Sequence, residues 1–419
     1  MSIHLSRIQR ALGLAALLLS PHAALAHDIS DNYAGTPILT PPTLQLADLD
    51  VACPLPLDDH PSAWPSLGSP WTHPPVCESS ADGTTKYCVY TNSRHGPRGW
   101  SIVTTPETAA NSVWILNQAL NGTTTKTRLP EPPAYKMVDV PGKGKGLVTT
   151  RKIRRYEEIL VDHATLMVDI MFTTRVPAFL GYRLLHAAVN QLADAESVLA
   201  LGQSNTLARD KIENILRTNA FNAKLGGAPH IALYPLVSRI NHACKANAYT
   251  RFMPETLQVS IRAARDIAAG EEITISYIPV GAPTSERAKK LSTWGFSCQC
   301  SLCQAPAEER EASDKRLGEI QQLRDYAIRA FQAGRAYQAL RFTRQVVNLL
   351  APEELWPLYA EQYENMARIF YTLRDRANAE KYANMALELL AEQGHVPRAD
   401  KREVERMFAK FEEEEGGRY

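Results

Sequence analysis

The 419-residue chain lacks strong features that would assign it to a class at once. Its net charge is only +1, from 46 basic and 45 acidic residues, so binding to nucleic acid or an anionic membrane would need a local charged patch. We expect no direct nucleic-acid partner. No run of eighteen apolar residues follows the N-terminus, so we also expect no transmembrane anchor. The composition, 45% hydrophobic and 22% charged, is ordinary for a folded protein of two or three domains.

The first residues lack acidic side chains, since no Asp or Glu precedes Asp28. Arg7 and Arg10 come before the short apolar run ALGLAALLLS, and the small residues ALA end just before His27. This pattern predicts a signal peptide over residues 1–26 and a location in the secretory pathway or outside the cell. A transit peptide has similar features, so an intracellular location (nuclear, cytoplasmic or mitochondrial) stays open.

Cysteine is scarce and unevenly placed, and three of the seven cysteines lie in residues 27–133. That stretch is rich in proline, which is excluded from helix interiors, and we interpret it as a Pro-rich N-terminal extension with a few short strands. A helix is predicted from Thr105 onward, because Thr105 can cap it and Pro106 suits its first turn. Cys77 and Cys88 are close enough for a disulfide. Cys53 competes for that pairing, and three free thiols are an equally open alternative.

The other four cysteines have a spacing typical of metal ligands. Cys298, Cys300 and Cys303 lie within six residues, where adjacent disulfides would be strained. Tetrahedral Zn²⁺ takes four ligands, and the remaining cysteine outside the extension is Cys244. We therefore predict a four-thiolate zinc site of these residues. A secreted protein with these sulfurs oxidised to disulfides is the alternative.

Hydrophobic periodicity divides the rest of the chain. Strand patterns separated by a glycine-rich turn occupy 135–165, helix-forming residues occupy 176–220, and strand patterns return over 231–278. From 306 onward the chain is helical and charged. Segments 336–350 and 376–390 resemble each other at a 40-residue offset, which is typical of tetratricopeptide-like (TPR-like) helical hairpins, with a plain helical bundle as the alternative.

Three motifs and the cysteine cluster occur in a fixed order: GKGKGL at 142–147, NHACKAN at 241–247, GEEITISY at 270–277, and the cluster at 298–303. Together they resemble the SET-domain protein lysine methyltransferase family, in particular the subfamily related to the SET-and-MYND enzymes. The resemblance covers roughly residues 135–305. The MYND finger is absent, because no Cys/His cluster lies between 147 and 240.

The resemblance implies an α+β fold. It would consist of a SET domain over 134–280 with small curved sheets, a pseudo-knot and a helical insertion at about 176–220. A zinc-bound post-SET segment over 281–305 and a helical TPR-like domain over 306–419 would follow.

The resemblance also implies S-adenosylmethionine as cofactor and the ε-amine of a lysine in a protein, histone or non-histone, as substrate. The implied catalytic residue is Tyr277, which with Phe221 would line the lysine channel. The implied cofactor contacts are Lys143, Gly144, Lys145, Asn219, Asn241, His242 and Phe296, while Trp294 is interpreted as a core residue.

Two positions depart from the family's Asn-His-Ser-Cys-x-Pro-Asn motif: Ala243 replaces the serine and Ala246 the proline. Neither change deletes a ligand. They leave a second hypothesis open, a non-catalytic SET scaffold that binds peptides or partner proteins through its helical C-terminal domain. The sequence does not specify the oligomeric state.

Overall fold

The computed structural model describes residues 69–115, 132–203, 208–253, 256–393 and 401–416. The predicted signal peptide and Cys53 fall outside these residues.

The largest sheet has six strands in the order β1-β2-β3-β7-β9-β8. Only the central pair, β3 with β7, is parallel. The strands are β1 (Val76–Ser79), β2 (Lys86–Asn92), β3 (Trp100–Thr104), β7 (Leu166–Asp169), β8 (Phe221–Leu225) and β9 (Ala228–Leu233).

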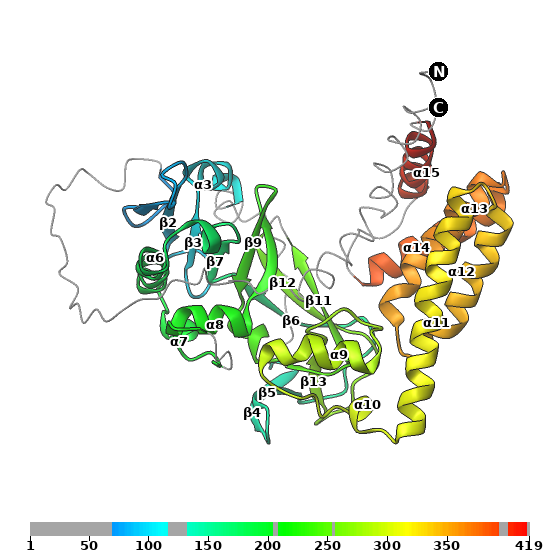
Figure 1. The fold of residues 1–419 in the computed structure, drawn as a ribbon, viewed down its shortest axis with the longest axis horizontal. Coiled ribbons are helices and arrows are strands. Elements are labelled where there is room, and N and C mark those ends of the chain that lie inside the picture. The colour runs from blue at the N-terminus through cyan, green and yellow to red at the C-terminus, as the bar shows by residue number, and fades with distance from the viewer. Residues whose placement is uncertain (1–68, 116–131, 204–207, 254–255, 394–400, 417–419) are drawn as a thin grey trace, which may run out of the picture.

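Both faces of the six-stranded sheet carry buried side chains. Successive residues of a strand point to opposite faces of the sheet, so consecutive apolar residues pack into two different cores. Ile102 and Met167 face a core shared with the smaller sheets. Their neighbours Val103 and Val168 face a second core. Helices α6 (Ala178–Asn190) and α8 (Lys211–Asn219) complete this second core (Figure 1), and the short α5 (Phe172–Arg175) and α7 (Glu196–Leu199) flank them.

Two smaller sheets carry the sequence motifs. The four-stranded sheet has the order β10-β13-β5-β4 and the three-stranded sheet β11-β12-β6. The strands are β4 (Tyr135–Val140), β5 (Gly144–Thr149), β6 (Glu158–His163), β10 (Asn241–His242), β11 (Ala248–Met253), β12 (Gln258–Ala263) and β13 (Glu272–Ile275). The mixed α+β class with small sheets is therefore confirmed.

The N-terminal stretch is more ordered than an extension of loops. Strands β1 to β3 form half of the six-stranded sheet, and Trp100 is fully buried in the same core as Leu147 of β5. The boundary expected at residue 133 therefore does not separate two cores.

The helix predicted from Thr105 begins there and is interrupted at Ser112. The Thr105 hydroxyl accepts a hydrogen bond from the Thr108 backbone N–H at 3.3 Å. Helix α3 runs over Pro106–Asn111, and residues 113–115, the last of this described range, are again helical. The Ser112 hydroxyl donates to the Thr108 carbonyl at 2.6 Å. Serine competes in this way with the regular helical ladder, and it marks the end of α3.

A disulfide joins Cys77 and Cys88, which lie directly opposite each other on β1 and β2. Of the alternatives that the sequence left open, the pairing within this hairpin is the one found.

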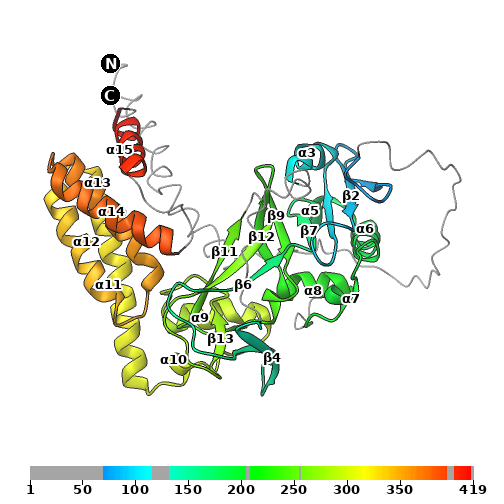
Figure 2. The ribbon, with the colours of Figure 1, turned by 180° about the vertical axis from the view of Figure 1, so that it is seen from behind.

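The C-terminal part is helical, as predicted, and lies beside the β-rich part (Figures 1 and 2). Short helices α9 (Thr284–Leu291) and α10 (Ser301–Gln304) lead into α11 (Ala307–Gln332), α12 (Ala336–Leu350), α13 (Tyr359–Thr372), α14 (Arg376–Glu392) and α15 (Lys401–Gly416). Ala339 of α12 and Ala379 of α14 correspond at the 40-residue offset between the two similar segments, and both are fully buried. Within the described ranges, every helix is too short or too polar to cross a bilayer.

Candidate cofactor and substrate site

One cavity of about 420 Å³ gathers the residues that the resemblance named. Its wall includes all of the expected cofactor and channel residues: Lys143, Gly144, Lys145, Asn219, Phe221, Asn241, His242, Tyr277 and Phe296. They come from four separate stretches of chain, brought together by β5, β8, β10 and the segment after β13. We call this space the first cavity.

The glycine-rich turn between β4 and β5 forms one side of the first cavity. Gly142 and Gly144 both have φ of +74°, a conformation that residues with a Cβ rarely adopt. At Gly146 space is the constraint, because an added Cβ would lie 3.0 Å from the Asn241 side-chain nitrogen. The turn thus depends on glycine for its shape and for its close approach to β10.

Glu272 holds two of the expected cofactor residues, a role that the sequence reasoning missed. One carboxylate oxygen accepts from the Lys143 ammonium at 2.8 Å, and the other accepts from the Asn241 amide at 2.9 Å. The Asn241 amide also donates to the Lys145 carbonyl at 3.2 Å. The motif GEEITISY contains the signal, but strand register decides which of its two glutamates faces the turn.

His242 is a neutral, oriented imidazole. Its Nδ1 accepts from the Tyr277 backbone N–H at 3.0 Å, so the ring proton resides on Nε2, which faces Cys244 Sγ at 3.4 Å. Burial lowers the pKa of His242 to about 4. The ring therefore connects the segment that follows β13 to the cysteine cluster.

Tyr277 lies at the centre of an aromatic group. Its hydroxyl donates to the Ile240 carbonyl at 2.7 Å, and burial, followed by the Glu272 carboxylate, raises its pKa above the usual value. Its ring centroid is 6.4 Å from that of Phe296, with perpendicular planes, and 6.0 Å from that of Trp294. Trp294 also lines the first cavity, so its interpretation as a core residue was wrong.

Asn219 and Phe221 close the first cavity on the side of α8. The Asn219 amide donates to the Gly202 and Ile215 carbonyls at 2.7 and 2.8 Å. Both Asn219 and Phe221 line the cavity, as does Arg239. Sequence reasoning passed over Arg239, although it lies two residues before Asn241.

The four cysteines outside the N-terminal part of the fold form one cluster. The sulfurs of Cys244, Cys298, Cys300 and Cys303 all lie within 4.8 Å of one another, and none of the four is in a disulfide. Cys244 Sγ is 3.8 Å from Cys298 Sγ and 3.5 Å from Cys303 Sγ. Four ligands about 2.3 Å from one Zn²⁺ in a tetrahedron lie about 3.8 Å apart. The spacing therefore fits a zinc ion and excludes the disulfide alternative for this arrangement.

The alanine at the serine position of the motif suits this environment. Ala243 is buried against Cys300 and Leu302, so a methyl group packs where a hydroxyl would need a partner.

A second cavity of about 400 Å³ lies between the β-rich part and helices α11, α13 and α14. Thr250, Ser276 and Tyr277 line both cavities. The cysteine cluster also contributes to both, Cys298 to the first and Cys244 to the second. The two cavities therefore share part of their walls at the end of β13, where Tyr277 lines both.

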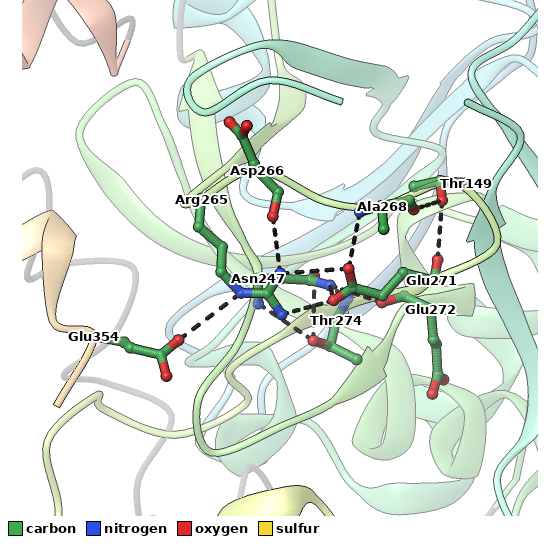
Figure 3. A network of polar contacts seen from close by, with 9 residues as sticks. All are labelled: Thr149, Asn247, Arg265, Asp266, Ala268, Glu271, Glu272, Thr274 and Glu354. Atoms are coloured by element: carbon green, nitrogen blue, oxygen red, sulfur yellow. Dashed lines mark hydrogen bonds and ion pairs between the residues drawn. The ribbon is translucent and has the colours of Figure 1, made fainter. Parts of the chain in front are cut away.

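A network of polar contacts holds β13 in place next to the residues that line both cavities (Figure 3). Asn247 is 2% exposed. Its side-chain oxygen accepts a hydrogen bond from the Thr274 backbone N–H at 2.8 Å, and its side-chain nitrogen donates one to the Glu271 carboxylate at 3.1 Å. Glu271 pairs with Arg265 at 2.6 Å, and Arg265 reaches Glu354 of the helical region at 3.8 Å. The network thus extends from the Asn-His-Ala-Cys segment to the C-terminal helices.

Residues 144–278 match the family model of the SET domain, so the chain contains a SET domain. Among curated proteins it is similar to histone-lysine N-methyltransferase set5 of Schizosaccharomyces pombe, with 29% identity over 201 residues, 45% of this chain and 57% of the relative. It is also similar to histone-lysine N-methyltransferase ATXR2 of Arabidopsis thaliana, with 45% identity over 74 residues, 17% of this chain and 16% of the relative. A third relative is histone-lysine N-methyltransferase SMYD3 of Homo sapiens, with 37% identity over 82 residues, 19% of each chain.

These matches cover only part of each relative: 57% of set5 and less than a fifth of the other two. They confirm the resemblance read from the motifs.

Proposed function

We propose that the protein transfers a methyl group from S-adenosylmethionine to the ε-amine of a lysine in a protein substrate. The observation that carries the proposal is that Tyr277 lines both cavities. Methyl transfer to a protein needs a cofactor and a peptide that approach one reacting centre from different sides. The first cavity would hold the cofactor, and the second would admit the substrate chain.

The wall of the first cavity suits S-adenosylmethionine, which supplies an electrophilic methyl group when bound. Lys143, Lys145 and Arg239 give the cavity cationic side chains. Lys143 and Lys145 already pair with Glu272 and Asp139, so Arg239 is the one best able to pair with a carboxylate. Phe296, 38% exposed, offers an aromatic face for an adenine ring. His242 and Asn241 are held in place by the hydrogen bonds described above, so they need little reordering on binding.

The surroundings of Tyr277 favour a neutral amine as nucleophile. The tyrosine hydroxyl gives its own proton to the Ile240 carbonyl, so its oxygen is left to accept a hydrogen bond from the incoming amine. Burial disfavours the ammonium form of lysine, and only the neutral amine carries the lone pair needed for attack. Holding that amine in line with the methyl group accounts for much of the expected acceleration.

We also propose that Cys244, Cys298, Cys300 and Cys303 bind a structural zinc ion. Such an ion would fix the segment after Tyr277 against the segment that begins at Asn241. Its loss is therefore expected to weaken cofactor binding as well as stability.

The test is transfer of label from S-adenosylmethionine carrying a radioactive methyl group, with core histones as the first substrates because the relatives are named for histone lysine. Tyr277→Phe is expected to lower transfer by about a hundredfold while calorimetry still detects cofactor binding. Asn241→Ala is expected to abolish cofactor binding. Tyr337→Phe, at a 77% exposed position on α12, is the matched control. Cofactor binding without any transfer to histones or a whole proteome would instead support the scaffold hypothesis.

For the compartment, we propose that the chain enters the secretory pathway after removal of residues 1–26. The Cys77–Cys88 disulfide supports this proposal, because such bonds persist mainly in oxidising compartments. Mass spectrometry of the mature N-terminus tests it: a chain beginning at His27 is expected, and an intact Met1 would contradict cleavage.

A further inference from the structure

Two residues that line the second cavity each carry a buried polar group that has no partner within the part of the chain that the structure describes. These groups are the Tyr249 hydroxyl and the Gln393 side-chain nitrogen. Gln393 as a whole is only 2% exposed. Buried polar groups in proteins are almost always hydrogen-bonded, and each that is not needs an explanation.

The two groups belong to one region of the second cavity. Tyr249 of β11 lies opposite Arg262 of β12 in the sheet register. The Arg262 guanidinium donates to the Glu392 carbonyl at 3.4 Å, and Glu392 directly precedes Gln393. The end of α14 is thereby held against the strand pair that carries Tyr249.

This region is also close to the reacting centre. Thr250 follows Tyr249 in β11 and lines both cavities together with Tyr277. Tyr249 and Tyr277 line the same second cavity, so a substrate chain that lies in it with its lysine at Tyr277 can bring a flanking residue to Tyr249.

Both unpartnered groups can donate a hydrogen bond. Burial raises the pKa of Tyr249, so its hydroxyl keeps its proton, and the guanidinium groups of Arg262, Arg251 and Arg155 lie near it. An apolar substrate side chain would leave two donors unsatisfied, and so would a basic one, because Lys and Arg side chains carry donors only. An oxygen acceptor satisfies both donors.

Five glutamates line the second cavity, and each already has a cationic partner, so they do not favour basic substrate residues over such an acceptor. Three of the ion pairs are short: Glu353 with Arg316 at 2.6 Å, Glu286 with Lys290 at 2.7 Å and Glu361 with Arg324 at 2.8 Å. Glu354 and Glu364 lie 3.8 Å from Arg265 and Arg368.

We infer that Tyr249 and Gln393 form a specificity subsite for an acceptor side chain, an amide or a carboxylate, on the substrate residue that flanks the target lysine. The inference rests on the proposed methyltransferase function and names the substrate feature that the site selects. The protein thus prefers a lysine with Gln, Asn, Glu or Asp at one nearby position over a lysine flanked by apolar or basic residues.

The experiment uses the full-length protein, labelled S-adenosylmethionine and an arrayed peptide library with a single central lysine. Three positions on each side are fixed in turn as Gln, Glu, Leu or Arg, and the others are a mixture without lysine. At one position, Gln or Glu is expected to be labelled about tenfold better than Leu or Arg, the value of one buried hydrogen bond. The ratio of Gln to Glu distinguishes amide from carboxylate recognition.

Tyr249→Phe and Gln393→Met are each expected to bring that preference close to one, and Tyr337→Phe is expected to keep it. Tyr249→Phe should also leave the unfolding temperature unchanged or raised, because it removes a hydroxyl that has no partner, whereas a structurally bonded hydroxyl would cost stability. A library that is labelled without preference, or a preference that survives in both variants, overturns the subsite alone. A library that stays unlabelled overturns the methyltransferase function and the subsite with it.

Discussion

Gly146→Ala tests whether the glycine-rich turn supports cofactor binding because its backbone lies close to the Asn241 side chain. The new Cβ would lie 2.5 Å from Val140 Cγ2, 3.0 Å from the Asn241 side-chain nitrogen and 3.2 Å from a Glu272 carboxylate oxygen. The valine must leave its rotamer, which costs about 1 kcal/mol. The amide must also move by a few tenths of an ångström. Overpacking of this kind costs about 1–3 kcal/mol in total.

The displacement also has a functional cost. Asn241 donates to the Lys145 carbonyl and to Glu272, and these bonds fix its position in the wall of the first cavity. Weakening one of them is expected to lower the affinity for S-adenosylmethionine about tenfold. Calorimetry with the cofactor and thermal unfolding followed by circular dichroism measure the two effects.

Gly318→Ala is the matched control. Gly318 is an exposed residue inside α11, and an added Cβ there would meet no atom within 4 Å. Replacing an interior helical glycine by alanine should stabilise that helix by about 0.5–1 kcal/mol, with no effect on cofactor affinity. If Gly146→Ala behaved like Gly318→Ala, the argument from close approach would be refuted.

Three further predictions concern other parts of the fold. Cys298→Ser is expected to reduce zinc below one ion per chain and to weaken cofactor binding at least tenfold, measured by metal analysis and calorimetry; full cofactor affinity without zinc would contradict the role given to the cluster. His95 has a pKa lowered to about 4, first by burial and then by His163, so the unfolded state binds its proton more readily. Its contribution to the free energy of unfolding, up to about 3 kcal/mol, is present above pH 6.5 and is lost as the pH falls towards 4. His95→Gln should therefore flatten the dependence of the unfolding free energy on pH in that window. An unchanged slope would argue against this role of His95. Replacing Cys77 and Cys88 together by serine should lower stability by about 2–3 kcal/mol, because the bond closes a loop of eleven residues; denaturation of the wild-type chain under reducing conditions should show the same loss.

Local signals could be predicted from the sequence where backbone chemistry or residue type dictates them. The glycine-rich turn between two strands and the four-cysteine cluster are of this kind, and elimination points to Cys244, 54 residues before Cys298, as the fourth member of the cluster. Neither needs knowledge of distant packing.

Features that depend on register or on long-range pairing could not be predicted in the same way. Glu271 and Glu272 are neighbours with similar chemistry, but alternation along β13 sends one to Arg265 and the other to Lys143. Trp294 was assigned to the core because a large apolar ring is usually buried. Its place on the cavity wall follows from the path of the post-SET segment, which no local pattern encodes.

The parallel pairing of β3 with β7 has a consequence for any attempt to isolate the catalytic part. A fragment beginning at residue 134 would remove β1 to β3 and leave β7 as an edge strand. All four residues of β7 are buried in the intact protein, and β7 would then present an open hydrogen-bonding edge between two apolar faces. Such edges pair with other copies of the chain, so this fragment is expected to aggregate, whereas a chain that keeps β1 to β3 retains β3 as the strand that covers β7.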